Sequence, residues 1–277
     1  MLTQPSPGPG HDARVRLRLL SVVPVVLAMV LVAGCSDDDK SSSSSSSGSS
    51  ALPSDDDLAT YFGAVASYDV DQLAAAEGIA ADGSPAQDYL RYQQAYATAS
   101  TAGGNPLPSA EAEPVDGGFQ ACQDAGEGEE CATWADLQGK DGRLSGFTVN
   151  GSDIKDSLVS LEDQPPIDVE GLFSVQPAFA YLSTPLHVLF VLVDVTATDL
   201  PLEVLSRRAV YVDQVTVLSG ADSRGPTTVD PGQSQTVILA FPDAEGTALD
   251  GQVTFDVTVG GTDHQSVGFG LADPAAG

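Results

Sequence analysis

The sequence predicts a mainly β protein, with a small α+β region in front of a C-terminal β-sandwich. Residues 54–100 contain two helix-start signals and apolar residues at helical spacing. Residues 119–149 contain short strand patterns separated by tight-turn signals. Beyond residue 166 the chain consists almost entirely of short apolar or alternating segments with turns between them. Such a succession of strands is typical of a sandwich.

The charge of the chain excludes one class of partner. The 277 residues include 11 basic and 39 acidic side chains, which give a net charge of −28. Because phosphates repel so acidic a surface, we expect no nucleic-acid partner. The same charge would repel an anionic membrane, so attachment to a membrane would need a lipid.

The first 34 residues have the pattern of a secretory signal peptide. Arg14, Arg16 and Arg18 precede an apolar run from Leu19 to Val32. As a helix this run would be about 21 Å long, which is short of the hydrocarbon core of roughly 30 Å. A positive segment, a short apolar segment and small residues are typical of export. Because no paired arginines occur, the pattern favours the general secretory route.

The signal ends in Val32-Ala33-Gly34-Cys35, which resembles the lipobox of bacterial lipoproteins. The resemblance implies cleavage after Gly34 and a diacylglyceryl group on the sulfur of Cys35. Two acyl chains anchor a protein stably. We therefore expect a protein held by this lipid on the extracytoplasmic face of the cell membrane. The alternative is an ordinary signal peptide with a chance cysteine.

Residues 35–53 are expected to be a disordered tether. They include seven consecutive serines, Ser41 to Ser47, and have almost no apolar residues to bury. A flexible chain of this length has an r.m.s. span of roughly 20–25 Å.

The predicted small domain, residues 54–162, begins with helices. Ser54 and Asp57 form a capping-box pattern, and Ser84 followed by Pro85 is a second helix start. Tyr89, Tyr92 and Tyr96 then lie on one helix face. Such an aromatic stripe is usually core. The functional alternative is the wall of a ligand pocket, because tyrosine combines an apolar ring with a polar hydroxyl.

Two cysteines remain if Cys35 carries a lipid. Cys122 and Cys131 end two strand patterns that flank a short loop rich in glycine and glutamate. In an exported protein such a pair predicts a disulfide across the hairpin. Turns at Asp141-Gly142 and Asn150-Gly151 predict the following hairpins.

The cysteine loop is also strongly acidic. It contains Asp124, Glu127, Glu129 and Glu130. Oxygen-rich loops suit calcium in extracellular proteins, but no EF-hand spacing occurs here. A solvated loop is the simpler interpretation, so no metal ligand is assigned and calcium binding is left open.

Three segments of this region together resemble the N-terminal part of actinobacterial lipoproteins. They are SPAQDYLRYQQAY, the cysteine hairpin and DGRLSGFTVNG. The arrangement is similar to the α+β cone of nuclear transport factor two-like proteins. The resemblance implies helices covering one face of a curved sheet, with the tyrosine stripe facing a cavity.

Pro165-Pro166 marks the start of the predicted sandwich, residues 165–273. His187 to Val195 is a continuous apolar segment, which predicts a central strand with His187 packed at its start. The segments VDPGQSQTVILAF (229–241) and GQVTFDVTV (251–259) resemble the immunoglobulin-like, telokin-like extracellular domain of bacterial lipoproteins. This resemblance covers roughly residues 172–271 and implies an adhesive or accessory module without catalytic residues.

Known catalytic motifs are absent from the sequence. Only His187 and His264 remain after residue 34, and neither a nucleophile elbow nor a zinc-binding His-Glu-x-x-His occurs. We therefore assign no catalytic residue and no cofactor. We expect a non-enzymatic binding or interaction protein of the bacterial cell envelope, whose partner is an envelope protein or a small ligand. The alternatives are a structural spacer or assembly accessory, and a carboxylate-based hydrolase acting between the two domains.

The first prediction concerns the anchor. Replacing Cys35 by alanine should release the protein from the membrane fraction, because no sulfur is left to accept the lipid. Fractionation of cells tests this, and mass spectrometry of the wild-type protein should find a diacylglyceryl adduct on Cys35. An unmodified Cys35 in the membrane-bound protein would contradict the prediction.

Overall fold

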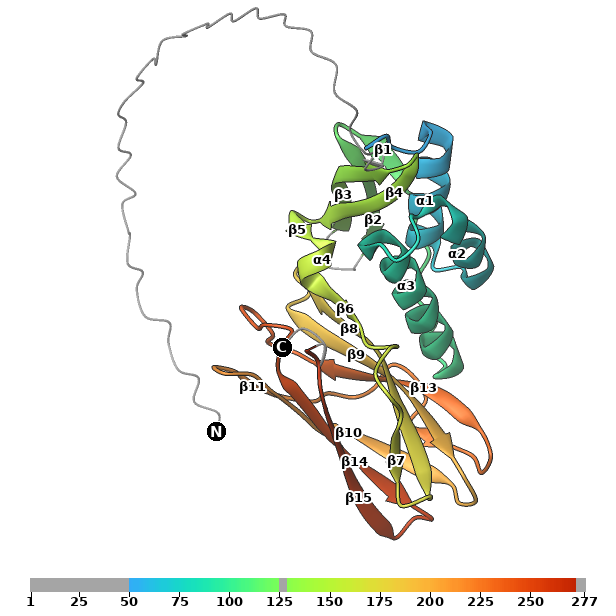
Figure 1. The fold of residues 1–277 in the computed structure, drawn as a ribbon, viewed down its shortest axis with the longest axis vertical. Coiled ribbons are helices and arrows are strands. Elements are labelled where there is room, and N and C mark those ends of the chain that lie inside the picture. Colours follow the sequence, from blue (N-terminus) through green and yellow to red (C-terminus); the bar gives the residue numbers. More distant parts are fainter. Residues whose placement is uncertain (1–49, 125–128, 273–277) are drawn as a thin grey trace, which may run out of the picture. The chain divides into compact units, whose positions relative to one another are not determined.

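A computed structural model describes residues 50–124 and 129–272 (Figure 1). All of these described residues belong to one compact unit. The fold is mainly β and is built from antiparallel sheets. The predicted signal peptide, Cys35 and most of the tether lie outside the described residues. The division of the chain at residues 163–164 stays a prediction.

A helix begins at each of the two predicted capping signals, and a further short helix, which these signals do not predict, lies between them. They are α1 (Asp55–Ser67), α2 (Val70–Ala76), a 3₁₀ turn (Glu77–Ile79) and α3 (Pro85–Ala102). The Ser54 side chain accepts a hydrogen bond from the backbone N–H of Asp57, at 3.2 Å. Ser84 caps α3 in the same way, with the N–H of Gln87 at 3.3 Å. Both caps satisfy backbone donors that the first turn of a helix leaves free.

A five-stranded antiparallel sheet follows, in chain order. Its strands are β1 (Glu113–Val115), β2 (Gly118–Asp124), β3 (Glu129–Lys140), β4 (Arg143–Val149) and β5 (Ser152–Asp153). Cys122 lies directly opposite Cys131, and their sulfurs are 2.05 Å apart in the predicted disulfide. Asp141-Gly142 and Asn150-Gly151 have positive φ angles, as two-residue hairpin turns require.

Two further antiparallel sheets follow the short helix α4 (Ile154–Ser157). One sheet contains β6 (Leu158–Ser160), β7 (Ile167–Val169), β8 (Phe173–Ser183), β9 (Val188–Ala197) and β13 (Ser234–Phe241). The other contains β10 (Leu202–Val212), β11 (Val217–Ser219), β12 (Thr228–Val229), β14 (Gln252–Val259) and β15 (Asp263–Gly270).

Alternate residues of these two sheets share one core, as in a β-sandwich. Val191, Val193 and Val195 of β9 belong to this core together with Phe255 and Val257 of β14, and all are fully buried. Because side chains alternate along a strand, the residues between them lie on the opposite face of their sheet.

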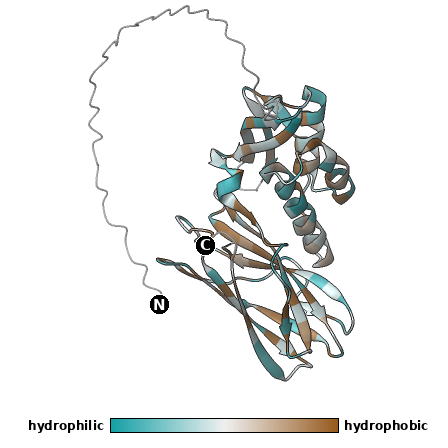
Figure 2. Ribbon diagram, in the orientation of Figure 1, coloured by the Kyte–Doolittle hydropathy of each residue, from teal (hydrophilic) through white to brown (hydrophobic). Residues whose placement is uncertain are grey.

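The opposite face of the β6–β8–β9–β13 sheet is buried as well. Phe190 and Leu192 of β9 and Ile238 of β13 belong to a second core, which also contains the aromatic residues of α3. Helix α3 contacts both β13 and β6. The sheet is therefore covered on two faces, which explains why β9 is apolar without alternation. Figure 2 shows β8 and β9 as hydrophobic over most of their length.

The prediction for His187 was wrong in one respect. Strand β9 is central, between β8 and β13, but it begins at Val188. His187 is exposed in the preceding turn, with φ of 49°. Its carbonyl oxygen accepts a hydrogen bond from the N–H of Ala244, at 2.8 Å. The residue is polar and follows Thr184-Pro185, so it closes a tight connection rather than packing in the core.

The two-faced burial of this sheet predicts a matched pair of variants. Ile238 and Leu239 are adjacent on β13, both fully buried, and lie in different cores. Replacing either by alanine should lower the free energy of unfolding by about 2–5 kcal/mol, because each leaves a cavity in a packed interior. Chemical denaturation measures both. If Leu239→Ala lowered the free energy of unfolding by this amount and Ile238→Ala left it almost unchanged, the result would contradict packing on the helix side of the sheet.

Candidate functional site

A pocket of about 340 Å³ lies where α3 meets β2, β3 and the β8–β9 hairpin. Its size falls within the range of small-molecule sites. Seven aromatic side chains from these elements and their flanking turns line it: Tyr68, Tyr89, Tyr92, Tyr96, Trp134, Tyr181 and Phe190. Both the helical region and the sandwich contribute to the wall.

The predicted tyrosine stripe lies at this pocket. Tyr89, Tyr92 and Tyr96 are all less than 10% exposed, and all three line the cavity. The rings of Tyr92 and Tyr96 stack with centroids 5.8 Å apart, and Tyr92 lies 4.9 Å from Tyr181 of β8. The stripe is thus part of the core, and its residues also border an open space.

Tyr68 reaches the pocket through an unusual backbone conformation. It ends α1 in the left-handed region, with φ of 54°, where glycine or asparagine is usual. A bulky residue at positive φ is uncommon and often occurs at functional sites. The helical spacing of Leu58, Phe62, Val65 and Tyr68 indicated only a packed face, so sequence reasoning did not place Tyr68 at a site.

Polar groups converge on the hydroxyl of Tyr89. The side chains of Gln93, Trp134 and Tyr181 all donate toward it. The contact from Trp134 is loose, because its buried indole N–H meets no acceptor with full hydrogen-bond geometry. A hydroxyl can accept about two hydrogen bonds and has one proton to donate. This part of the wall therefore has donor capacity left for a bound molecule.

Burial moves the ionisation of these hydroxyls further from neutral pH. It raises the pKa of Tyr89, Tyr92 and Tyr181 well above the ordinary value. Burial also raises the pKa of Tyr96 to about 12, although the nearby Arg224 guanidinium acts in the opposite direction. At neutral pH the wall presents neutral phenols, which can donate as well as accept hydrogen bonds.

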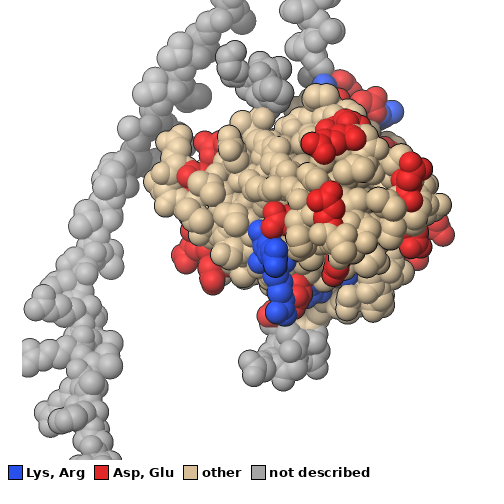
Figure 3. Space-filling view, turned by 90° about the horizontal axis from the view of Figure 1, so that it is seen from below, with Lys and Arg blue, Asp and Glu red and all other residues tan. Residues whose placement is uncertain are grey.

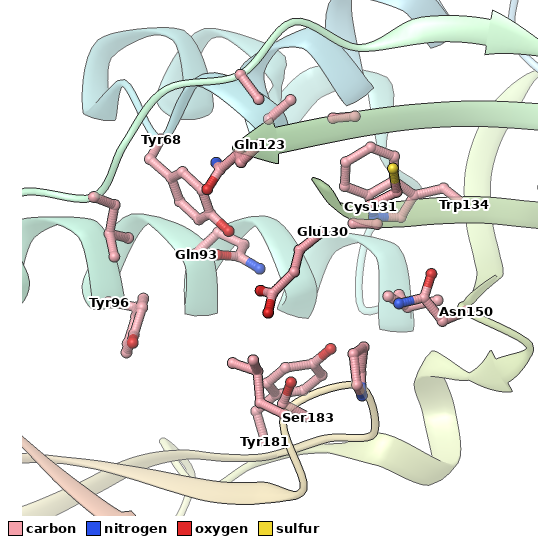
Figure 4. A pocket seen from close by; sticks show the side chains of 18 of the residues that line it. Tyr68, Gln93, Tyr96, Gln123, Glu130, Cys131, Trp134, Asn150, Tyr181 and Ser183 are labelled. Carbon is pink, nitrogen blue, oxygen red and sulfur yellow. The ribbon is translucent and has the colours of Figure 1, made fainter. Parts of the chain in front are cut away.

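Two charged residues line the pocket, Glu130 and Arg224. Glu130 comes from β3, directly beside the disulfide-bonded Cys131. Figure 4 shows its carboxylate projecting into the cavity between Gln93 and the side chains of Tyr181 and Ser183. Neither charged residue forms an ion pair with another residue in the described part of the chain.

The loop that carries Arg224 is held against the end of α3. A Cβ on Gly103 would lie 2.4 Å from the Arg224 carbonyl oxygen, so this close approach requires glycine. The Asn105 amide donates to the same oxygen at 3.0 Å. Two residues earlier, Asp222 pairs with Arg207. The backbone of Arg224 is thus fixed from two directions.

The surface elsewhere differs from the pocket in how its charges are arranged. Acidic side chains lie in separate patches across the face in Figure 3, with one larger basic band beside acidic groups. Five arginine or lysine side chains in residues 50–124 and 129–272 have an acidic partner within 4.0 Å: Arg91, Arg143, Lys155, Arg207 and Arg208.

Most of the acidic cysteine loop, for which calcium binding is left open, lies outside the described residues. Glu127 and the side chains of Asp124 and Glu129 are among the undescribed groups, and Glu130 is the member that the structure places. Within the described residues, Glu130 is the sole carboxylate that lines the pocket. A pair of acids for carboxylate-based hydrolysis is therefore not formed by the described lining.

Comparison with known proteins adds little. No protein-family model matches the sequence. No curated protein matches it either. The solved structure of a functionally unknown protein from Listeria monocytogenes EGD-e is similar to part of the chain, with 12% identity and a TM-score of 0.29. That match covers 41% of this chain and 83% of the other. None of the described helices is long and apolar enough to cross a membrane.

The buried tyrosines predict a specific dependence on pH. An exposed tyrosine ionises near pH 10, whereas Tyr96 in the folded protein does so at about 12. Between these values the folded chain holds more protons than the unfolded chain, so its stability should fall as the pH rises through this window. Ultraviolet titration of tyrosinate should give a late transition in the folded protein and an ordinary one in urea. A single transition near pH 10 in both would contradict this burial.

Proposed function

We propose that this protein is a lipid-anchored, extracytoplasmic binding protein of the bacterial cell envelope, and that the tyrosine-lined pocket holds a small amphipathic ligand. The observation that carries the proposal is the pocket itself. Its wall is aromatic, the buried indole N–H of Trp134 has no acceptor with full hydrogen-bond geometry in the described structure, and its volume suits a small molecule. We propose no catalytic residue and no cofactor.

The anchor and the location rest on the sequence. The signal pattern and the lipobox-like Val32 to Cys35 support a lipid on Cys35. The disulfide between Cys122 and Cys131 is consistent with folding in an oxidising compartment. On this proposal the serine-rich tether separates the pocket from the membrane surface.

We also infer the finer fold types. The contacts of α1 with β2 and of α3 with β4 support an α+β arrangement over residues 54–162, similar to a nuclear transport factor two-like cone. For the sandwich, the turn in which Gln233 N–H donates to Asp230 at 3.0 Å precedes β13. This turn and the alternating strand β14 support the immunoglobulin-like type.

A pocket-filling variant tests the proposed function. Ala132 lines the pocket from β3, so Ala132→Phe should occupy the cavity and abolish ligand binding. The matched control is Gln138→Phe, which adds the same side chain at an exposed position on the same strand, outside the pocket. Trp134 is the single tryptophan of the chain and lines the pocket, so its fluorescence reports occupancy.

The assay begins with small molecules that co-purify with the protein, identified by native mass spectrometry. Adding such a molecule back should change Trp134 fluorescence saturably in the wild-type protein and in Gln138→Phe, but not in Ala132→Phe. Binding that survives in Ala132→Phe would place the ligand elsewhere. If no molecule from an envelope extract binds, the spacer alternative is the better account.

A further inference from the structure

The pocket contains two charges of opposite sign that do not neutralise each other. Glu130 and Arg224 both line it, and their side chains are not within ion-pair distance of one another. Most other basic side chains of the described chain have an acidic partner nearby. In a protein with a net charge of −28, an arginine without an acidic partner among the described residues, at the edge of an aromatic pocket, is a distinctive feature.

Each charge has surroundings that suit a particular group on a ligand. Arg224, Tyr68 and Tyr96 all line the pocket. Burial raises the pKa of both phenols, and the Arg224 guanidinium acts in the opposite direction on each. Together they offer several hydrogen-bond donors, which is a suitable environment for an oxyanion. The Glu130 carboxylate projects between Gln93 and Tyr181 (Figure 4). A carboxylate near electron-rich aromatic rings is a suitable environment for an organic cation.

The cost of covering these charges favours a ligand that carries both signs. Glu130 and Arg224 are both exposed in the structure, so water solvates them until a ligand covers them. A neutral ligand would displace part of that water without giving either charge a partner, which is unfavourable. A ligand with one charge would leave the other group unpaired. A ligand with an ammonium group and an oxyanion would pair with both.

We propose that the ligand of this pocket is zwitterionic, with an ammonium group beside Glu130 and a carboxylate or phosphate group beside Arg224. This inference rests on the proposed function, because it names the chemical class of the pocket's ligand. The apolar part of the ligand would lie against Phe190 and the tyrosine rings.

Two matched series of probes test the charge requirement. One is hexylphosphocholine, hexyltrimethylammonium, hexyl phosphate and hexanol. The other is phenylalanine, phenethylamine, 3-phenylpropanoate and 3-phenylpropanol. Within each series the apolar part is kept while the charge changes, and the two series separate the charges by different distances. Binding to the full chain is followed by Trp134 fluorescence and calorimetry.

The zwitterion of at least one series should bind about ten-fold more tightly than its cationic, anionic and neutral relatives. Glu130→Gln should weaken the binding of the zwitterion and of the cation, but not the binding of the anion. Arg224→Gln should weaken the binding of the zwitterion and of the anion, but not the binding of the cation. The matched controls are Glu203→Gln and Arg143→Gln, which change exposed charges outside the pocket and should alter none of these affinities.

The remaining outcomes separate the two proposals. If the neutral probe binds as tightly as the zwitterion, and Ala132→Phe abolishes that binding, the pocket is a binding site but the zwitterionic class is wrong. If only the cation or only the anion depends on its charged residue, the ligand carries a single charge and this inference fails. If no probe of either series binds, the inference fails together with a small-ligand function for the pocket.

Discussion

Burial of the β6–β8–β9–β13 sheet on both faces is the constraint on which the rest of the structure depends. One face shares a core with the β10–β14–β15 sheet, and the other shares a core with α3 and the aromatic residues around it. A sheet in this position must be apolar on both sides, which is unusual for antiparallel strands. Because neither face can be exposed to water without a large loss of hydrophobic burial, the helical region and the sandwich are stabilised together.

The pocket follows from this arrangement. Helix α3 lies over one end of the two-faced sheet, and the β2–β3 hairpin covers the other side of its tyrosine stripe. Three walls built from rigid elements leave a space that large rings border but do not fill. The same tyrosines therefore contribute to stability through their rings and to binding through their hydroxyls. Tyr68, at the left-handed end of α1, adds a further hydroxyl from a separate element.

The two charges of the pocket are positioned by one local and one long-range set of contacts. The disulfide joins β2 to β3 directly beside Glu130 and so holds the two strands of this hairpin together. Arg224 is placed by the close approach of its backbone to Gly103 and by the amide of Asn105, more than 100 residues away in the chain. The backbone that carries each charge is thus restrained, while both side chains are exposed and available to a ligand.

The sequence by itself determined the local features of this protein, because their causes are local. Ser54 and Ser84 start helices by capping nearby N–H groups, and Asp141-Gly142 and Asn150-Gly151 form the hairpin turns. The mainly β class and the cysteine pair also follow from short patterns, and so does the candidate anchor at Cys35. Only the tertiary structure decided that the apolar run of β9 is buried by a helix as well as by a second sheet. It alone brought Glu130, Arg224 and Tyr181 to the tyrosine stripe, because contacts between distant segments leave no periodic signal in the chain.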